Sequence, residues 1–198
     1  MPDRIGRPAT AAIIAALGFA VGLAGDATHV ASGTTQYEWD DVPTIWKSAF
    51  WFPLLIAFSV TATAYIADRA GLTAARTRTR AEVPAGAAAV LALYAITAVI
   101  HDEPATVSVT LTGAIAVAIW SWWDPSKLAL FTALAAALLG PLAEMAVVEI
   151  GAASYSESAD DLAGVAPWLP CLYFAAGAVA SGLWAAVERP LPSAPERP

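Results

Sequence analysis

Six apolar segments, each long enough to cross a lipid bilayer, take up most of this 198-residue chain. They cover residues 9–24, 42–67, 83–100, 104–123, 128–150 and 167–187. A helix needs about 20 apolar residues to cross the hydrocarbon core of a bilayer, and hydrocarbon satisfies no backbone polar group outside a helix or barrel. The sequence therefore predicts an all-α membrane protein, with residues 1–198 forming a single domain, a bundle of six transmembrane helices.

The composition supports a membrane protein and argues against several soluble classes. Hydrophobic residues make up 58% of the chain and charged residues only 14%, whereas soluble domains carry about 25% charged residues. No basic cluster is interleaved with aromatic residues, so the sequence predicts no nucleic-acid partner. The first segment also fits a cleaved signal peptide, because a basic start precedes a short apolar core. A first transmembrane helix is the preferred interpretation of this segment.

Basic residues alternate with the six segments. Nine of the ten fall on one side of the membrane if the segments alternate in direction, and only Lys47 falls on the other. Lys and Arg are retained on the cytoplasmic side during insertion, so both termini are predicted to be cytoplasmic. The predicted outer loops are acidic and contain Asp26, Glu38, Asp40, Asp41, Asp102, Glu103, Glu157, Asp160 and Asp161.

Tryptophans lie near the predicted ends of the spans. An indole ring favours the head-group layer, where its N–H finds a polar partner. The sequence therefore predicts interfacial anchors at Trp39, Trp46, Trp168, Trp120, Trp122, Trp123 and Trp184.

Side chains suited to catalysis or metal binding are not clustered in the sequence. The two histidines, His29 and His101, are expected in separate outer loops or at loop edges, and no H-E-x-x-H spacing is present. The pairs Asp40–Asp41 and Asp160–Asp161 lack the continuation to D-D-x-x-D that would suggest a magnesium–diphosphate site. The sequence therefore predicts a protein that is not an enzyme and that has no metal or cofactor.

Glu144 is the most unusual residue, because it lies inside the fifth segment, three residues after Pro141. A carboxylate in hydrocarbon is unfavourable unless it is paired, solvated or protonated. A proline within a helix removes a backbone hydrogen bond and tends to kink the helix. Two interpretations remain open: Glu144 lines a polar pocket, or it hydrogen bonds to a neighbouring helix.

Small residues recur at a spacing of four in two segments. Gly18 and Gly22 do so in the first, and Gly177 and Gly182 belong to such a face in the sixth. Such faces let helix backbones approach closely in lipid. They fit packing within the bundle or an interface of a homo-oligomer.

The last third of the chain contains a recognisable pattern. Trp168-Leu169-Pro170-Cys171 is followed by Phe174-Ala175-Ala176-Gly177, and upstream lie Trp122-Trp123-Asp124 and Asp68-Arg69. In these features the sequence resembles the Insig family, the sterol-responsive membrane proteins of the endoplasmic reticulum. Alanine and arginine are frequent and lysine is nearly absent, which is typical of a GC-rich bacterial genome and suggests a bacterial homologue.

The resemblance implies a bundle of six helices that binds lipid rather than catalysing a reaction. Family members hold a sterol between helices and bind partner membrane proteins, and an aspartate matching Asp161 contributes to partner binding. The expected location is the inner membrane of a bacterium, or the endoplasmic reticulum of a eukaryote. In a bacterial relative, a neutral lipid such as diacylglycerol would suit the same cavity.

The proline-containing second and fifth segments are predicted to enclose this sterol-like or diacylglycerol-like ligand. The expected ligand-binding residues are Trp51, Phe52, Phe58, Thr61, Glu144 and Met145. The alternative function is a small transporter or channel, since intramembrane carboxylates often mark ion or proton paths. In that case Glu144 is the residue that carries the activity.

Overall fold

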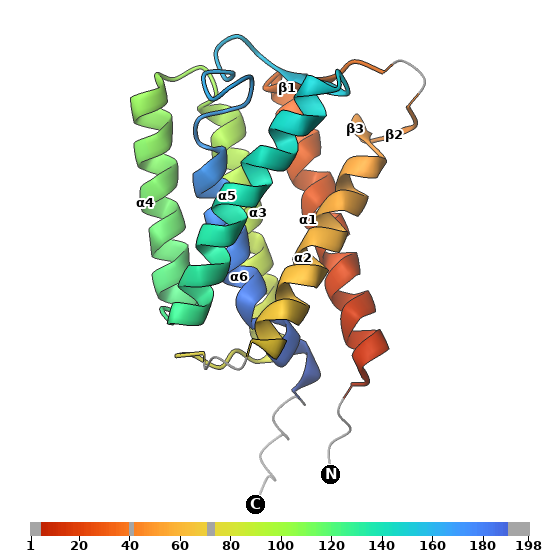
Figure 1. Ribbon diagram of the computed structural model, residues 1–198, viewed down its shortest axis with the longest axis vertical. Helices are drawn as coiled ribbons and strands as arrows, with labels where there is room; N and C mark the ends of the chain where they lie inside the picture. The colour runs from red at the N-terminus through yellow and green to blue at the C-terminus, as the bar shows by residue number, and fades with distance from the viewer. Residues whose placement is uncertain (1–4, 40–41, 71–73, 190–198) are drawn as a thin grey trace, which may run out of the picture.

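In the computed structural model, which describes residues 5–39, 42–70 and 74–189, the chain forms a bundle of long helices (Figure 1). Within these ranges six helices are long and apolar enough to cross a membrane. They are α1 Arg7–Ser32, α2 Trp51–Arg69, α3 Val83–Val99, α4 Ala105–Trp123, α5 Lys127–Glu149 and α6 Leu169–Glu188. A short 3-10 helix, Arg80–Glu82, leads into α3. The prediction of an all-α, six-helix membrane protein is confirmed.

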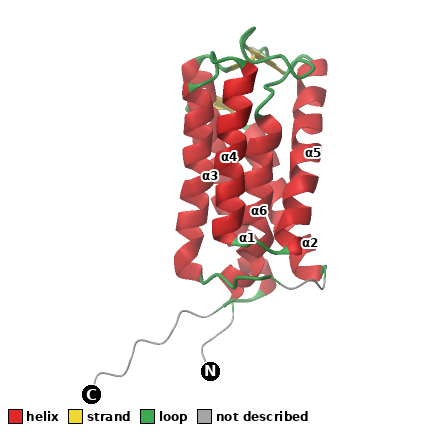
Figure 2. Cartoon of the chain, turned by 90° about the vertical axis from the view of Figure 1, so that its left-hand side faces the viewer, coloured by secondary structure: helices red, strands yellow, loops and turns green. Residues whose placement is uncertain are grey.

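The two ends of the bundle differ in structure and charge. α1 begins and α6 ends at the same end, called here the termini end (Figures 1 and 2). Short antiparallel strands lie at the opposite end, called the strand end: β1 Thr35–Tyr37 pairs with β4 Ala153–Tyr155, and β2 Thr44–Ile45 pairs with β3 Ser48–Ala49. Of the eight described Lys and Arg residues, only Lys47 belongs to the strand end. The charge pattern therefore matches the two ends of the folded bundle.

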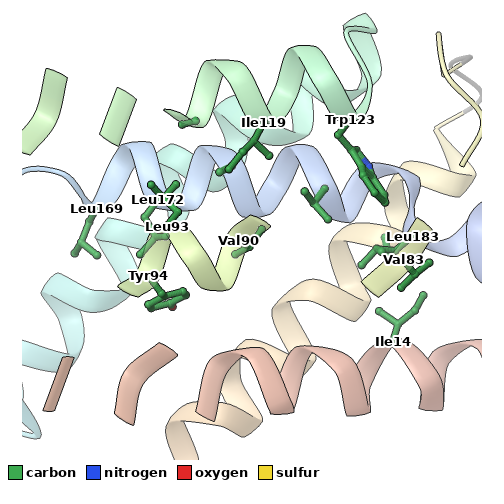
Figure 3. Close-up of a cluster of buried hydrophobic side chains, with 14 of the residues drawn as sticks. Ile14, Val83, Val90, Leu93, Tyr94, Ile119, Trp123, Leu169, Leu172 and Leu183 are labelled. Carbon is green, nitrogen blue, oxygen red and sulfur yellow. The ribbon is translucent and has the colours of Figure 1, made fainter. Parts of the chain in front are cut away.

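α6 forms the centre of the bundle. Twelve of its twenty residues are buried, whereas only six of the twenty-three residues of α5 are. Figure 3 shows Leu169, Leu172 and Leu183 of α6 among buried side chains that come from several other helices. Because α6 is surrounded by protein, its alanines and glycines set how closely the outer helices approach.

Four glycines allow close contacts inside the bundle. A Cβ atom on Gly22 would lie 2.8 Å from Cβ of Ile56 in α2, and one on Gly18 would lie 3.1 Å from Cα of Ala57. A Cβ on Gly177 would lie 2.6 Å from the carbonyl oxygen of Thr132 in α5, and one on Gly182 would lie 3.1 Å from a Trp123 nitrogen. All four glycines therefore serve packing within the bundle, and their faces are not available to a second copy of the chain.

α1 is longer than predicted. The first segment was expected to end at residue 24, but the helix continues to Ser32 and ends at Gly33, whose φ of 83° is left-handed. Asp26 and His29 are therefore buried helix residues. The prediction that Asp26 lies in an outer loop is wrong, and His29, expected in a loop or at its edge, lies in the last turn of α1. A hydropathy pattern ends at a polar residue, whereas a helix continues when that residue finds partners inside the protein.

α2 begins later than predicted. It was expected to start at residue 42, but residues 44–49 form the β2–β3 hairpin and the helix begins at Trp51. The predicted acidic pair Asp40–Asp41, and Arg4 and Arg197 of the predicted basic set, lie outside the described residues.

Several tryptophans do not act as the predicted interfacial anchors. Trp123, Trp168 and Trp184 are each at most 3% exposed. Trp123 fits against Gly86, where a Cβ would lie 2.6 Å from its ring. Trp122 and Trp46 remain exposed, as anchors require. The prediction is wrong for the three buried rings because they pack inside the protein, and for Trp123 the glycines Gly86 and Gly182 make the room.

Candidate lipid-binding site

An apolar cavity of about 100 Å³ lies among α1, α2, α3 and α6, with Ala136 contributed by α5. Its walls consist mainly of aliphatic side chains such as Leu17, Val60 and Leu172. The polar side chains among its lining residues are Ser59, Thr63, Tyr94 and Tyr173. One water molecule needs about 10–15 Å³ of such space, so this cavity has room for part of a larger apolar molecule.

The apolar cavity opens sideways toward the membrane. Ser59 lines it and is at the same time exposed on the outer surface of α2. Leu54, Leu55 and Phe58 of the same helix are also exposed, so this surface faces hydrocarbon in a bilayer. A hydrophobic molecule can reach the cavity from the membrane without crossing water.

A second, polar cavity of about 20 Å³ lies near the strand end. Residues from every helix except α4, together with β1 and β4, meet around it. The residues that line it include Asp26, His29, Thr35, Tyr37, Trp51, Phe52, Tyr94, Glu144 and Tyr155. Tyr94 lines both cavities, so the two are neighbours.

Tyrosine hydroxyls hold the two carboxyl groups of this cavity. Tyr37 donates to Oδ2 of Asp26 at 2.6 Å, and Tyr173 donates to Oε1 of Glu144 at 2.7 Å. Burial raises the pKa of Tyr37 and of Tyr155, which lie outside the helices, and the negative charges of Asp26 and Glu144 respectively raise them further. Both phenols therefore keep their protons and act as hydrogen-bond donors.

His29 is joined to α3 by a hydrogen-bond chain. Thr97 donates its hydroxyl to the carbonyl oxygen of Tyr94 at 2.8 Å, and Nε2 of His29 lies 2.9 Å from the same hydroxyl oxygen. A threonine hydroxyl has one proton. Since that proton goes to Tyr94, Nε2 of His29 must be the donor. The ring of His29 also lies against Trp168, with centroids 5.2 Å apart.

Polar groups without partners remain at this cavity. The hydroxyl of Thr35 and the indole N–H of Trp51 are buried and have no hydrogen-bond partner among the described residues. Among the described residues, the ion pairs are Arg78–Glu82 and His101–Asp102. Neither Asp26 nor Glu144 therefore has a salt-bridge partner among those residues. The cavity therefore has donors and acceptors to offer a small polar group.

The predicted ligand-binding residues fall into two groups. Trp51, Phe52 and Glu144 line the polar cavity together. Phe58 is 73% exposed on the outer surface, and Thr61 donates to the carbonyl oxygen of Ala57 in its own helix at 2.7 Å. Met145 packs against the hydrophobic core. The structure thus brings three of the six residues together and leaves the other three outside both cavities.

Sequence reasoning missed most residues of the polar cavity. Asp26 and His29 are three residues apart, which puts them on one helix face, and this spacing could have identified them. Tyr37 and Tyr155 lie in loops and strands far apart in sequence, and only the pairing of β1 with β4 brings them together. For them the sequence contains no local signal.

The motif residues at the termini end have structural contacts. Oδ1 of Asp124 accepts hydrogen bonds from the backbone N–H groups of Ala75 and Arg76 at 2.9 and 3.1 Å. Arg78 stacks on the rings of Trp122 and Trp123 and donates to both of their carbonyl oxygens. The Trp-Trp-Asp motif therefore fixes residues 75–78, which precede α3, onto the end of α4.

Asp161, the predicted partner-binding residue, is exposed in the connection between β4 and α6. A tight turn follows it: Leu162 pairs with Val165, and Ala163 and Gly164 have φ values of 53° and 85°. The turn holds Asp161 at the surface of the strand end, where a second protein could reach it.

Comparison with known proteins places the chain in a family. No protein-family model matches it. A curated protein from Mycolicibacterium vanbaalenii, described as an INSIG protein homolog, is 38% identical over 191 residues, which is 93% of this chain and 90% of that protein. The crystal structure of the mycobacterial Insig homolog MvINS superposes with a TM-score of 0.84 at 34% identity, covering 93% of this chain and 98% of that one. A cross-linked trimer of MvINS gives the same values. With this identity over nearly its whole length, the chain belongs to the Insig family of membrane proteins.

Proposed function

We propose that this protein binds a neutral lipid, sterol-like or diacylglycerol-like, in the apolar cavity among α1, α2, α3 and α6. The observation that carries the proposal is the cavity itself: about 100 Å³ of apolar space that opens beside Ser59 of α2. An apolar pocket with a few polar groups is typical of sites for hydrophobic ligands. The protein then acts as a regulator or scaffold and not as an enzyme.

The chemistry of the walls supports a lipid over a water-soluble ligand. Each methylene group moved from water into such a cavity gains about 0.8 kcal/mol. A lipid that enters from the bilayer gains much less from the transfer. Its specificity must therefore come from shape and from the few polar groups near Tyr94 and Tyr173.

Native mass spectrometry of the purified protein, followed by lipid extraction, tests the proposal. We expect a lipid retained at one copy per chain. The variant Ala176→Phe places a phenyl ring in the apolar cavity, which Ala176 lines, and should displace the lipid. Leu138→Phe on the exposed surface of α5 is the matched control, because Leu138 is 62% exposed. Equal retention by the parent and Ala176→Phe would exclude this cavity as the site.

Regulation of this kind requires partners, and two features support them. Asp161 is exposed at the strand end, and we propose it as a contact for a partner membrane protein. A cysteine variant of MvINS has been crystallised as a cross-linked trimer, and we propose that this chain also forms a homo-oligomer. Since the similar proteins are mycobacterial, we place the protein in a bacterial plasma membrane with both termini in the cytoplasm.

Glu144 favours a second candidate function, a small transporter or channel. It is 8% exposed, it follows Pro141 within α5, and it has no cationic partner in the described ranges. Intramembrane carboxylates of this kind often mark ion or proton paths. A proteoliposome assay separates the functions: ion or proton flux abolished by Glu144→Gln would support transport, and absence of flux in the parent would exclude it.

A further inference from the structure

The polar cavity has room for one small group. Its volume of about 20 Å³ is close to what a single water molecule needs. A hydroxyl group is of similar size, whereas a phosphate with its three outer oxygens is larger. The cavity therefore admits the end of a lipid that carries a hydroxyl, but it is too small for a phosphorylated head group.

The open hydrogen-bonding positions of this cavity also suit a hydroxyl. The indole N–H of Trp51 can only donate, and it is buried without a partner. The hydroxyl of Thr35, a residue 8% exposed, is likewise unpartnered. The carboxyl groups of Asp26 and Glu144 accept hydrogen bonds from Tyr37 and Tyr173 respectively and retain further accepting capacity. A guest that accepts from Trp51 and donates to a carboxyl must be both acceptor and donor, as a hydroxyl is.

The carboxyl groups of the cavity oppose an anionic guest, because any that is ionised repels it. Two carboxyl groups line it, and neither has a Lys or Arg partner in the described parts of the chain. In a buried site of low dielectric, like charges repel strongly. Among the described residues that line the cavity, a phosphate would also find no Arg or Lys of the kind that usually binds it.

The polar cavity is adjacent to the proposed lipid site. Tyr94 lines both cavities, and Tyr173, which lines the apolar cavity, donates to Glu144 of the polar one. We infer that the polar cavity is a head-group subsite that selects a lipid with a free hydroxyl over its phosphorylated or esterified counterpart. The inference rests on the proposed function, since it takes part of the acyl chains or sterol rings to occupy the apolar cavity.

The test compares three lipids with the same acyl chains: a diacylglycerol, its 3-phosphate and its 3-acetate. Their binding to the purified full-length protein is measured by competition against a fluorescent diacylglycerol. We expect the phosphate and the acetate to bind at least about tenfold more weakly than the diacylglycerol. A tenfold change in Kd corresponds to the loss of one hydrogen bond of ordinary strength. Equal binding of the diacylglycerol and the acetate would overturn the hydroxyl-selective subsite while leaving the apolar lipid site in place. Binding of none of the three would overturn both.

Two variants assign the selectivity to named groups. Trp51→Phe removes the open N–H donor and should reduce the preference for the diacylglycerol over the acetate. Glu144→Gln keeps an acceptor for Tyr173 but removes a potential charge, and should improve binding of the 3-phosphate relative to the diacylglycerol. Glu149→Gln, on the exposed side of the same helix, is the matched control and should leave all three affinities unchanged. If Trp51→Phe, Glu144→Gln and the parent all show the same relative affinities for the three lipids, the selectivity does not arise in the polar cavity. That result would overturn the inference.

Discussion

The hydroxyl of Tyr173 in α6 donates a 2.7 Å hydrogen bond to Oε1 of Glu144 in α5. This bond joins the central helix to the helix that contains Pro141, inside a part of the protein that hydrocarbon surrounds. The sequence left two interpretations of Glu144 open, and both apply. Glu144 hydrogen bonds to a neighbouring helix, and it also lines a polar cavity.

Tyr173→Phe should destabilise the protein. It leaves a buried carboxyl without the donor that now satisfies one of its oxygens, and such a loss costs about 1–3 kcal/mol. Unfolding of the purified protein in detergent, followed by heat or denaturant, measures the change. Tyr65→Phe is the control, since Tyr65 is 41% exposed and its hydroxyl only receives a 3.4 Å bond from Arg69.

The double variant Tyr173→Phe with Glu144→Leu should be more stable than Tyr173→Phe alone. Removing both partners leaves no unsatisfied buried group, and apolar replacements of a buried polar pair are often nearly neutral. A double variant no more stable than Tyr173→Phe would show that Glu144 makes other interactions of equal importance, such as with Tyr155.

Gly177→Ala should separate α5 from α6. The added Cβ would lie 2.6 Å from the Thr132 carbonyl oxygen, a backbone atom that cannot move aside alone. Overpacking of this kind costs about 1–3 kcal/mol. Gly113→Ala is the control, since its Cβ would meet Sγ of Cys171 at 3.5 Å, an ordinary contact. An unchanged unfolding midpoint for Gly177→Ala would contradict the close packing of these helices.

Arg78→Lys should loosen the α2–α3 connection from the end of α4. The guanidinium donates to the carbonyl oxygens of Trp122 and Trp123 while it stacks on both rings, and an ammonium group has neither the planar shape nor the fork of donors. We expect a loss on the order of 1 kcal/mol in unfolding free energy. Arg69→Lys is the control and should have little effect, because Arg69 is exposed. An equal loss of unfolding free energy in the two variants would contradict a specific role of Arg78.

The two ends of the bundle should face opposite sides of the membrane. Single cysteines at Thr77 and Asp160, both exposed and at opposite ends, are placed in a Cys171→Ser background. In right-side-out cells an impermeant maleimide should label Asp160→Cys only, because basic residues mark the cytoplasmic end. Labelling of Thr77→Cys alone would reverse the orientation, and labelling of both would contradict the six-span topology.

The sequence by itself determined the number of helices and the side of the bundle to which each loop belongs. Both follow from one-dimensional patterns: the length of an apolar run against the thickness of a bilayer, and the alternation of basic residues with those runs. It also identified Glu144 as an unusual position, because a carboxyl group within an apolar segment is visible without knowledge of its neighbours.

Only the tertiary structure decided which polar residues form a site. Asp26 ends an apolar run in the sequence, yet α1 continues past it because Tyr37, eleven residues later, donates to its carboxyl. Thr61 satisfies its hydroxyl within its own helix, whereas Thr97 joins α3 to α1 through His29. Whether a polar side chain inside a membrane is bonded locally or faces a cavity depends on which residues of distant helices come within about 3 Å of it. Hydropathy does not contain that information, because it counts each residue without its neighbours.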